Sequence, residues 1–166
     1  MAVNQLVESL GELRNLYGQL YELGLRKKEL LIKDQLDELT GIINKETRLL
    51  KQLAESDNAR VRAIAALQRE KGQRVNTQAT LAQVSALLAD PEERRALNEA
   101  SQRLSETVAK LKELNALNQQ LIQQSIDFIE YSLDLMVGPA EDEVVYRNPN
   151  VQPYAPRRTG GFDYKA

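Results

Sequence analysis

The segment ADPEERRAL, residues 89–97, carries the strongest local structural signal in the sequence. Asp90 is a favourable N-cap, Pro91 suits the first position of a helix, and Glu93 completes a capping box. Apolar residues then recur every three or four positions, which predicts an amphipathic helix over about residues 91–136. At a rise of 1.5 Å per residue, this helix would be about 70 Å long.

Two further amphipathic helices are predicted upstream, over about residues 2–33 and 35–71. We expect Asp34 to cap the second of these helices and Gly72 to end it as a C-cap glycine. Because the link at Asp34 is short, the two helices should lie adjacent and antiparallel as an αα-hairpin. The apolar residues of the second helix that are expected to face inward are Leu36, Leu39, Ile43, Leu49, Leu50, Leu53, Val61, Ile64 and Leu67.

Three glycines interrupt the first predicted helix, at Gly11, Gly18 and Gly24. They fall roughly on one face, where we expect a neighbouring helix to approach closely. In the second helix, the polar triplet Ser-Asp-Asn at residues 56–58 has two possible interpretations, a kink or an ordinary polar turn of the helix.

The remaining segments complete the predicted fold. Residues 77–89 predict a short helix with either Thr77 or Thr80 as its cap. Residues 138–166 contain four of the five prolines and show no helical or strand period, which predicts a non-helical tail. We therefore expect an all-α protein, in which one helical domain, residues 1–137, combines a long antiparallel hairpin with a third long helix as an elongated three-helix coiled-coil bundle.

The composition excludes several classes of protein. A net charge of −2 provides no field that would hold a nucleic-acid backbone, so no nucleic-acid partner is expected. The chain has no Cys and no His, which excludes disulfides, thiolate nucleophiles, imidazole bases and zinc sites built on these residues. The first residues lack a basic region, so we expect no signal peptide, and no apolar run approaches the roughly 20 residues that span a bilayer. We expect a protein of a reducing compartment that does not insert into a membrane.

Paired carboxylates are the remaining candidates for catalysis. Asp34 with Asp37, and Glu92 with Glu93, lie at predicted helix starts, where capping and the helix dipole explain them. The acidic run at residues 141–143 lies in the predicted tail. We therefore expect no catalytic, cofactor-binding or metal-binding site, and we expect that the protein is not an enzyme.

The third predicted helix is apolar on more than one side near its end. The residues concerned are Leu121, Ile122, Phe128, Ile129, Leu133, Leu135, Met136 and Val137. A helix that is apolar over a broad arc must be covered on each side. Periodicity leaves two alternatives open: the hairpin and the short helix bury this surface, or part of it stays exposed as a binding site.

The segment LKELNALNQQLIQQSIDFIEYSLDLM, residues 111–136, contains the pattern S-x-D-F-I-E-Y ahead of a Leu-rich end. This pattern resembles the last helix of the FlgN family, which are cytoplasmic chaperones of the flagellar type III export system. The break at residues 32–39 and the closing FDYKA are also similar to the family. The residues that match in the last helix are Leu117, Asn118, Ser125, Phe128, Ile129, Glu130, Tyr131 and Leu133.

The resemblance implies a cytoplasmic chaperone that binds the C-terminal helices of flagellar hook–filament junction proteins. Such a chaperone prevents premature assembly of these proteins and delivers them to the export apparatus. A client helix would lay its apolar face beside the exposed part of the last helix. The residues implied in client binding are Leu117, Leu121, Ile122, Gln124, Ser125, Phe128, Ile129, Tyr131, Ser132 and Leu135.

The resemblance also implies a contact between the tail and the export gate or ATPase-associated export components. Tyr146 stands where the family has a docking tyrosine, although Arg147 replaces the glycine that usually follows. Phe162 and Tyr164 are further candidates in the tail. An alternative function is a non-enzymatic coiled-coil adaptor or structural dimer, whose apolar stripes pair with its own copy. The free protein is expected to be a monomer or a weak dimer.

Overall fold

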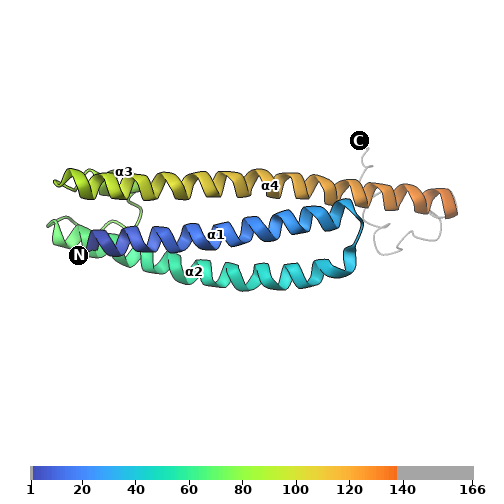
Figure 1. The fold of residues 1–166 in the computed structure, drawn as a ribbon, viewed down its shortest axis with the longest axis horizontal. Coiled ribbons are helices and arrows are strands. Elements are labelled where there is room, and N and C mark those ends of the chain that lie inside the picture. The colour runs from blue at the N-terminus through green and yellow to red at the C-terminus, as the bar shows by residue number, and fades with distance from the viewer. Residues whose placement is uncertain (1, 138–166) are drawn as a thin grey trace, which may run out of the picture. The chain divides into compact units, whose positions relative to one another are not determined.

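The computed structural model describes residues 2–137 and divides the chain into two compact units, residues 1–121 and 122–166. No strand occurs among the described residues. The predicted all-α class, a long hairpin followed by a third long helix, is confirmed. The elements in chain order are α1 (Ala2–Ile32), the 3₁₀ helix η1 (Leu36–Glu38), α2 (Leu39–Glu70), α3 (Leu81–Ser85) and α4 (Pro91–Val137) (Figure 1).

Helices α1 and α2 form the predicted antiparallel hairpin. At one end the backbone N–H of Ala2 donates to Glu70 Oε2 at 3.2 Å, and toward the other end Lys27 Nζ pairs with Glu46 Oε1 at 2.9 Å. Within the first unit, α4 runs in the same direction as α1 (Figure 1). The first unit is therefore a bundle of three long helices, with α3 in the connection between α2 and α4.

The turn between α1 and α2 is built differently from the expected one. Asp34 has a φ of 57°, in the left-handed region, and its N–H donates to the Leu31 carbonyl at 3.4 Å. The next N–H, that of Gln35, donates to the Leu30 carbonyl at 2.9 Å, which completes a Schellman motif. Asp34 therefore closes α1 and does not cap the second helix, because its short polar side chain tolerates the left-handed conformation. The predicted cap was wrong.

A guanidinium bridges the same turn. Arg26 donates from Nη1 to Glu29 Oε2 at 3.0 Å and from Nη2 to Glu38 Oε2 at 2.9 Å. The hydrogen bond to Glu29 contributes most to the raised pKa of Arg26. The hydrogen bond to Glu38 and the attraction of its carboxylate raise this pKa further. The guanidinium joins the end of α1 to η1.

The two other predicted helix ends agree with the structure. Gly72 has a φ of 66°, as expected of a glycine that follows the end of a helix. Helix α4 begins at Pro91, and the Asp90 Oδ1 accepts a hydrogen bond from the Glu92 N–H at 3.0 Å. Asp90 accepts from the second helical N–H rather than the third, and Glu93 makes no return bond to it in the described part of the chain, so the predicted capping box is not formed.

A complete capping box occurs at α3 instead. Thr80 Oγ1 accepts from the Gln83 N–H at 3.2 Å, while Gln83 Oε1 accepts from the Thr80 N–H at 2.9 Å. Of the two caps that the sequence left open, Thr80 is used and Thr77 is not. The helix is shorter than the predicted 77–89, because the backbone at Thr80 is still extended, with a ψ of 157°.

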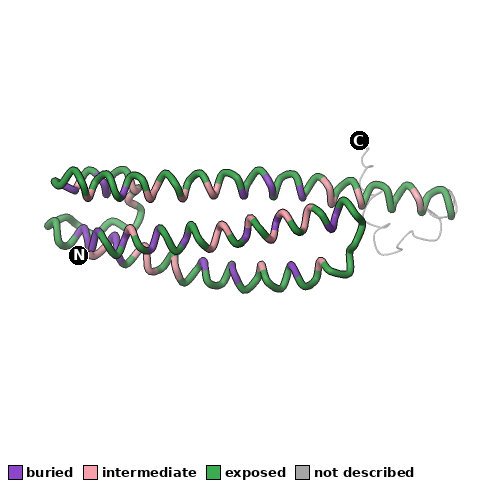
Figure 2. The backbone as a smooth tube through the Cα atoms, in the orientation of Figure 1, coloured by how far each residue is buried: buried purple, intermediate pink, exposed green. Residues whose placement is uncertain are grey.

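The core of the first unit joins all four α-helices (Figure 2). Helix α2 is continuous through residues 56–58, which form a polar turn rather than a break. Of the α2 residues expected to face inward, Leu49, Leu53, Ile64 and Leu67 are buried, whereas Leu39 and Val61 are half-buried. The side chains that are fully buried are Leu6, Leu10, Leu30, Leu67, Val84, Leu88 and Leu97.

Three of the expected inward residues are exposed instead. Leu36, Ile43 and Leu50 are 46%, 51% and 57% exposed, so these predictions were wrong. The buried stripe at this end of α2 runs through Ile42 and Leu49, one position before Ile43 and Leu50 along the chain. Two neighbouring apolar stripes share this part of α2, and periodicity alone cannot show which of them faces the core.

Candidate functional site

Contacts near the end of the first unit set the position of α4 against α1. Asn118 is 3% exposed, and its Nδ2 donates to the Gly24 carbonyl at 2.9 Å. A Cβ on Gly24 would lie 2.7 Å from Leu114 Cδ2, so the two helices approach closely here. Around Gly11 and Gly18, by contrast, a Cβ would meet nothing within 4 Å. The predicted close approach is correct at Gly24 and wrong at the other two glycines.

The end of α4, residues 122–137, belongs to the second unit. No residue of this stretch is buried. Phe128 is 68% exposed, Leu135 69% and Met136 81%, values that are high for large apolar side chains. We call its exposed large apolar residues the terminal apolar set: Ile126, Phe128, Ile129, Tyr131, Leu133, Leu135, Met136 and Val137.

The terminal apolar set occurs on a segment with a simple charge pattern. Residues 122–137 contain three acidic residues, Asp127, Glu130 and Asp134, and no Lys or Arg. Gln123 Nε2 donates to Asp127 Oδ1 at 3.0 Å along the helix surface. Within the second unit the large apolar side chains of α4 beyond Ile122 are exposed. Such a surface usually marks a site for another protein.

All ten residues implied in client binding lie on α4, and none is buried. Leu117 and Leu121 belong to the first unit, where Leu117 is exposed and Leu121 is half-buried. In the second unit the exposed members are Gln124, Phe128, Ile129, Tyr131 and Leu135, and the half-buried members are Ile122, Ser125 and Ser132. Their role in binding a client stays a prediction. The tail residues Tyr146, Phe162 and Tyr164 lie outside the described residues.

Sequence reasoning about client binding omitted Ile126, which is 43% exposed. The sequence already showed that Ile126 is apolar and lies in the same short stretch, which would have been enough to include it. Asn118 was included among the residues that match the family, but the structure buries it against Gly24. Its role is therefore in the packing of α4 on α1, not in a contact on the surface.

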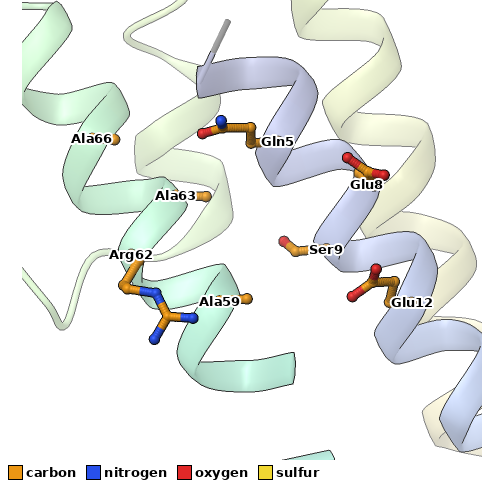
Figure 3. A pocket seen from close by; sticks show the side chains of 8 residues that line it. All are labelled: Gln5, Glu8, Ser9, Glu12, Ala59, Arg62, Ala63 and Ala66. Atoms are coloured by element: carbon orange, nitrogen blue, oxygen red, sulfur yellow. The ribbon is translucent and has the colours of Figure 1, made fainter. Parts of the chain in front are cut away.

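A separate hollow of about 390 Å³ lies between α1 and α2 (Figure 3). It is open to solvent, and charged or amide side chains from both helices surround a floor of small side chains. Sequence reasoning did not predict it, although the alanines recur every three or four positions along α2. The residues that line it are Gln5, Glu8, Ser9, Glu12, Ala59, Arg62, Ala63 and Ala66.

Within residues 2–137, no group of three or more acidic side chains could hold a metal ion. Among these same residues, no helix is both long enough and apolar enough to cross a membrane.

Described residues that form helices and no strand, with a large exposed apolar set on one helix, are typical of the class of helical proteins that bind other proteins. A sequence model of the FlgN protein matches residues 1–151. The chain therefore belongs to the FlgN family, a family of flagellar export chaperones and not of enzymes. The family predicted from the pattern in the last helix is confirmed, and it implies binding of flagellar substrate proteins.

The chain is also similar to the uncharacterized protein YvyG of Bacillus subtilis (strain 168). The two are 27% identical over 148 residues, which cover 88% of this chain and 87% of the relative. No solved structure matches the chain significantly.

Proposed function

We propose that this protein is a cytoplasmic chaperone that binds the C-terminal helices of flagellar hook–filament junction proteins. It keeps these helices from assembling prematurely and delivers the junction proteins to the export apparatus. Membership of the FlgN family supports the broader function of a flagellar export chaperone. The observation that carries the narrower proposal is the terminal apolar set, eight exposed large apolar residues within one segment of α4.

The physical basis is the burial of apolar surface between helices. An amphipathic client helix lays its apolar face on Phe128, Ile129 and Leu135, which lie on a segment of α4 with no buried residue. Each large side chain that becomes covered stabilises the complex by about 1.5–3 kcal/mol before the cost of ordering is subtracted. The glutamines and acidic residues between them keep the free segment hydrated.

The charge of the segment favours a particular kind of client helix. Asp127, Glu130 and Asp134 are all exposed, and no basic residue accompanies them in residues 122–137. A client helix with Lys or Arg beside its apolar face therefore complements this surface. Because the charges are exposed, we expect the association to weaken as salt is added.

The test is a titration of the full chain with a synthetic peptide from the C-terminal helix of a junction protein, followed by calorimetry. Replacing Phe128 and Ile129 together by Asp should weaken binding at least about tenfold, because two anchors become charged. The matched control replaces Ile43 and Leu50 by Asp, an exposed apolar pair on α2, and should bind as the wild-type chain does.

Two outcomes of the titration contradict the proposal. The first is that the variant with Phe128→Asp and Ile129→Asp binds the peptide with the affinity of the wild-type chain. The second is loss of helical circular dichroism in that variant, which would show that these side chains belong to a core. Light scattering separates the adaptor alternative, since a chaperone forms a one-to-one complex with the peptide, whereas a self-pairing adaptor ignores it.

A further inference from the structure

Helix α2 and the residues that lead into it carry a second exposed apolar stripe. Leu36, Ile43 and Leu50 are 46%, 51% and 57% exposed and lie seven positions apart. The residues between them on the same stripe are small, and they are also exposed. From Thr40 onward the alternate spacings of three and four are those of a coiled-coil seam, and Leu36 precedes them in η1. We call this stripe the α2 seam: Leu36, Thr40, Ile43, Thr47, Leu50 and Ala54.

The sizes of the seam residues fit one another when a second copy lies antiparallel. With the two-fold axis near residues 44 and 45, Leu36 of one copy lies opposite Ala54 of the other. In the same arrangement Leu50 faces Thr40, and Ile43 faces Thr47. Each large side chain thus meets a small one, which allows close packing. A parallel pairing would instead place each residue opposite itself, large against large and small against small.

The charges beside the seam select the same arrangement. Asp37, Asn44 and Lys51 are exposed, lie seven positions apart, and each directly follows a large seam residue. A two-fold interface brings residue i against residue j, and j against i. An axis near Asn44 therefore places Asp37 of each copy opposite Lys51 of the other. In a parallel pairing the two copies of this flanking position lie on opposite sides of the seam, so Asp37 and Lys51 would not meet.

We propose that a second copy of this chain binds the α2 seam in antiparallel orientation and forms a two-fold dimer. The seam has only three large apolar residues in each copy, so its interface is smaller than that of a standard stable complex. The dimer is accordingly weak and forms at high protein concentration. This dimer does not depend on the terminal apolar set and does not require a client.

The test is sedimentation of the full chain over a range of concentrations, with charge-swapped variants. Asp37→Lys and Lys51→Asp, each alone, place like charges opposite each other twice in the dimer. Each should weaken self-association at least about tenfold. An equimolar mixture of the two variants should restore it, because every Lys then faces an Asp. The control Lys112→Asp makes the same change of charge at an exposed position of α4 and should leave the dimer unchanged.

The proposal is supported if each single variant self-associates more weakly than the wild type. Self-association should then recover in the mixture and in the double swap Asp37→Lys with Lys51→Asp. Three results overturn the proposal: a wild-type chain that stays monomeric at millimolar concentration, single variants that dimerise as the wild type does, or folded single variants whose mixture does not recover. None of these measurements involves a client peptide, so their outcome is independent of the proposed chaperone function.

Discussion

Asn118 on α4 donates a hydrogen bond of 2.9 Å to the carbonyl of Gly24 on α1, and the amide is almost fully buried. The other amide atom of Asn118, Oδ1, is buried without a hydrogen-bond partner. A buried amide of this kind is costly unless the helices lie in one axial position, as with polar residues that fix the register of coiled coils. The pair therefore fixes how α4 lies along α1 in the first unit.

Substitution of the glycines in α1 tests this close approach. Gly24→Ala places a Cβ 2.7 Å from Leu114 Cδ2, whereas Gly11→Ala and Gly18→Ala meet nothing within 4 Å. Gly11→Ala and Gly18→Ala should each raise the free energy of unfolding by up to about 1 kcal/mol, because Ala has a higher helix propensity than Gly. The free energy of unfolding of Gly24→Ala should be about 1–3 kcal/mol lower than that of the other two variants, because the buried Leu114 must move. Urea denaturation measures these differences, and equal stability of the three variants would contradict the packing.

Removal of the Asn118 amide tests the hydrogen bond itself. Asn118→Ala should lower the free energy of unfolding by about 1–3 kcal/mol, since it removes a buried hydrogen bond and leaves unfilled space. The neighbouring Gln119→Ala is the control, because Gln119 is exposed, and it should change stability by less than about 0.5 kcal/mol. Thermal and urea unfolding give both values. A loss for Asn118→Ala no larger than for its control would show that the bond does not fix α4.

The capping box at the start of α3 gives a third prediction. Thr80→Ala should cost about 0.5–2 kcal/mol, because it removes the acceptor of the Gln83 N–H. Thr77 is exposed and caps no helix, so Thr77→Ala should leave stability nearly unchanged. The comparison of the two by chemical denaturation decides which threonine is the cap. A larger effect at Thr77 would contradict the structure.

The contact between the tail and the export components, which the family resemblance implies, gives a fourth prediction. Deletion of residues 138–166 should leave affinity for the client peptide largely intact and should reduce the amount of junction protein that cells export. Tyr146→Ala should reproduce the export defect. Loss of peptide affinity on deletion would instead show that the tail is part of the client-binding surface.

Local signals in the sequence predicted most of the fold. The Asp90-Pro91 start of α4 and the Gly72 end of α2 were correct because each depends on a few adjacent residues. Asp34 was assigned to the wrong helix, since an Asp is suited both to an N-cap and to a left-handed residue. Which apolar stripe of α2 is buried depends on the neighbouring helices, which is information that periodicity does not contain.

The candidate site was predicted less completely. The apolar identity of residues 122–137 was visible in the sequence, but their exposure depends on what the rest of the chain covers. Asn118 lies between Leu117 and the Gln-rich turn, and nothing in the sequence shows that its amide bonds Gly24 rather than a client. Family resemblance marks which residues match a pattern, whereas packing determines which of them remain available for binding.

Hydrogen exchange of the full chain, with and without a saturating junction-protein helix peptide, tests the central claim most directly. The proposal predicts that backbone amides of residues 122–137 exchange at least about tenfold more slowly in the complex, because the client helix covers the terminal apolar set. Amides of residues 73–79, which lie outside the helices, should be unaffected. Unchanged exchange across residues 122–137 while the peptide is bound would contradict the claim that this segment receives the client.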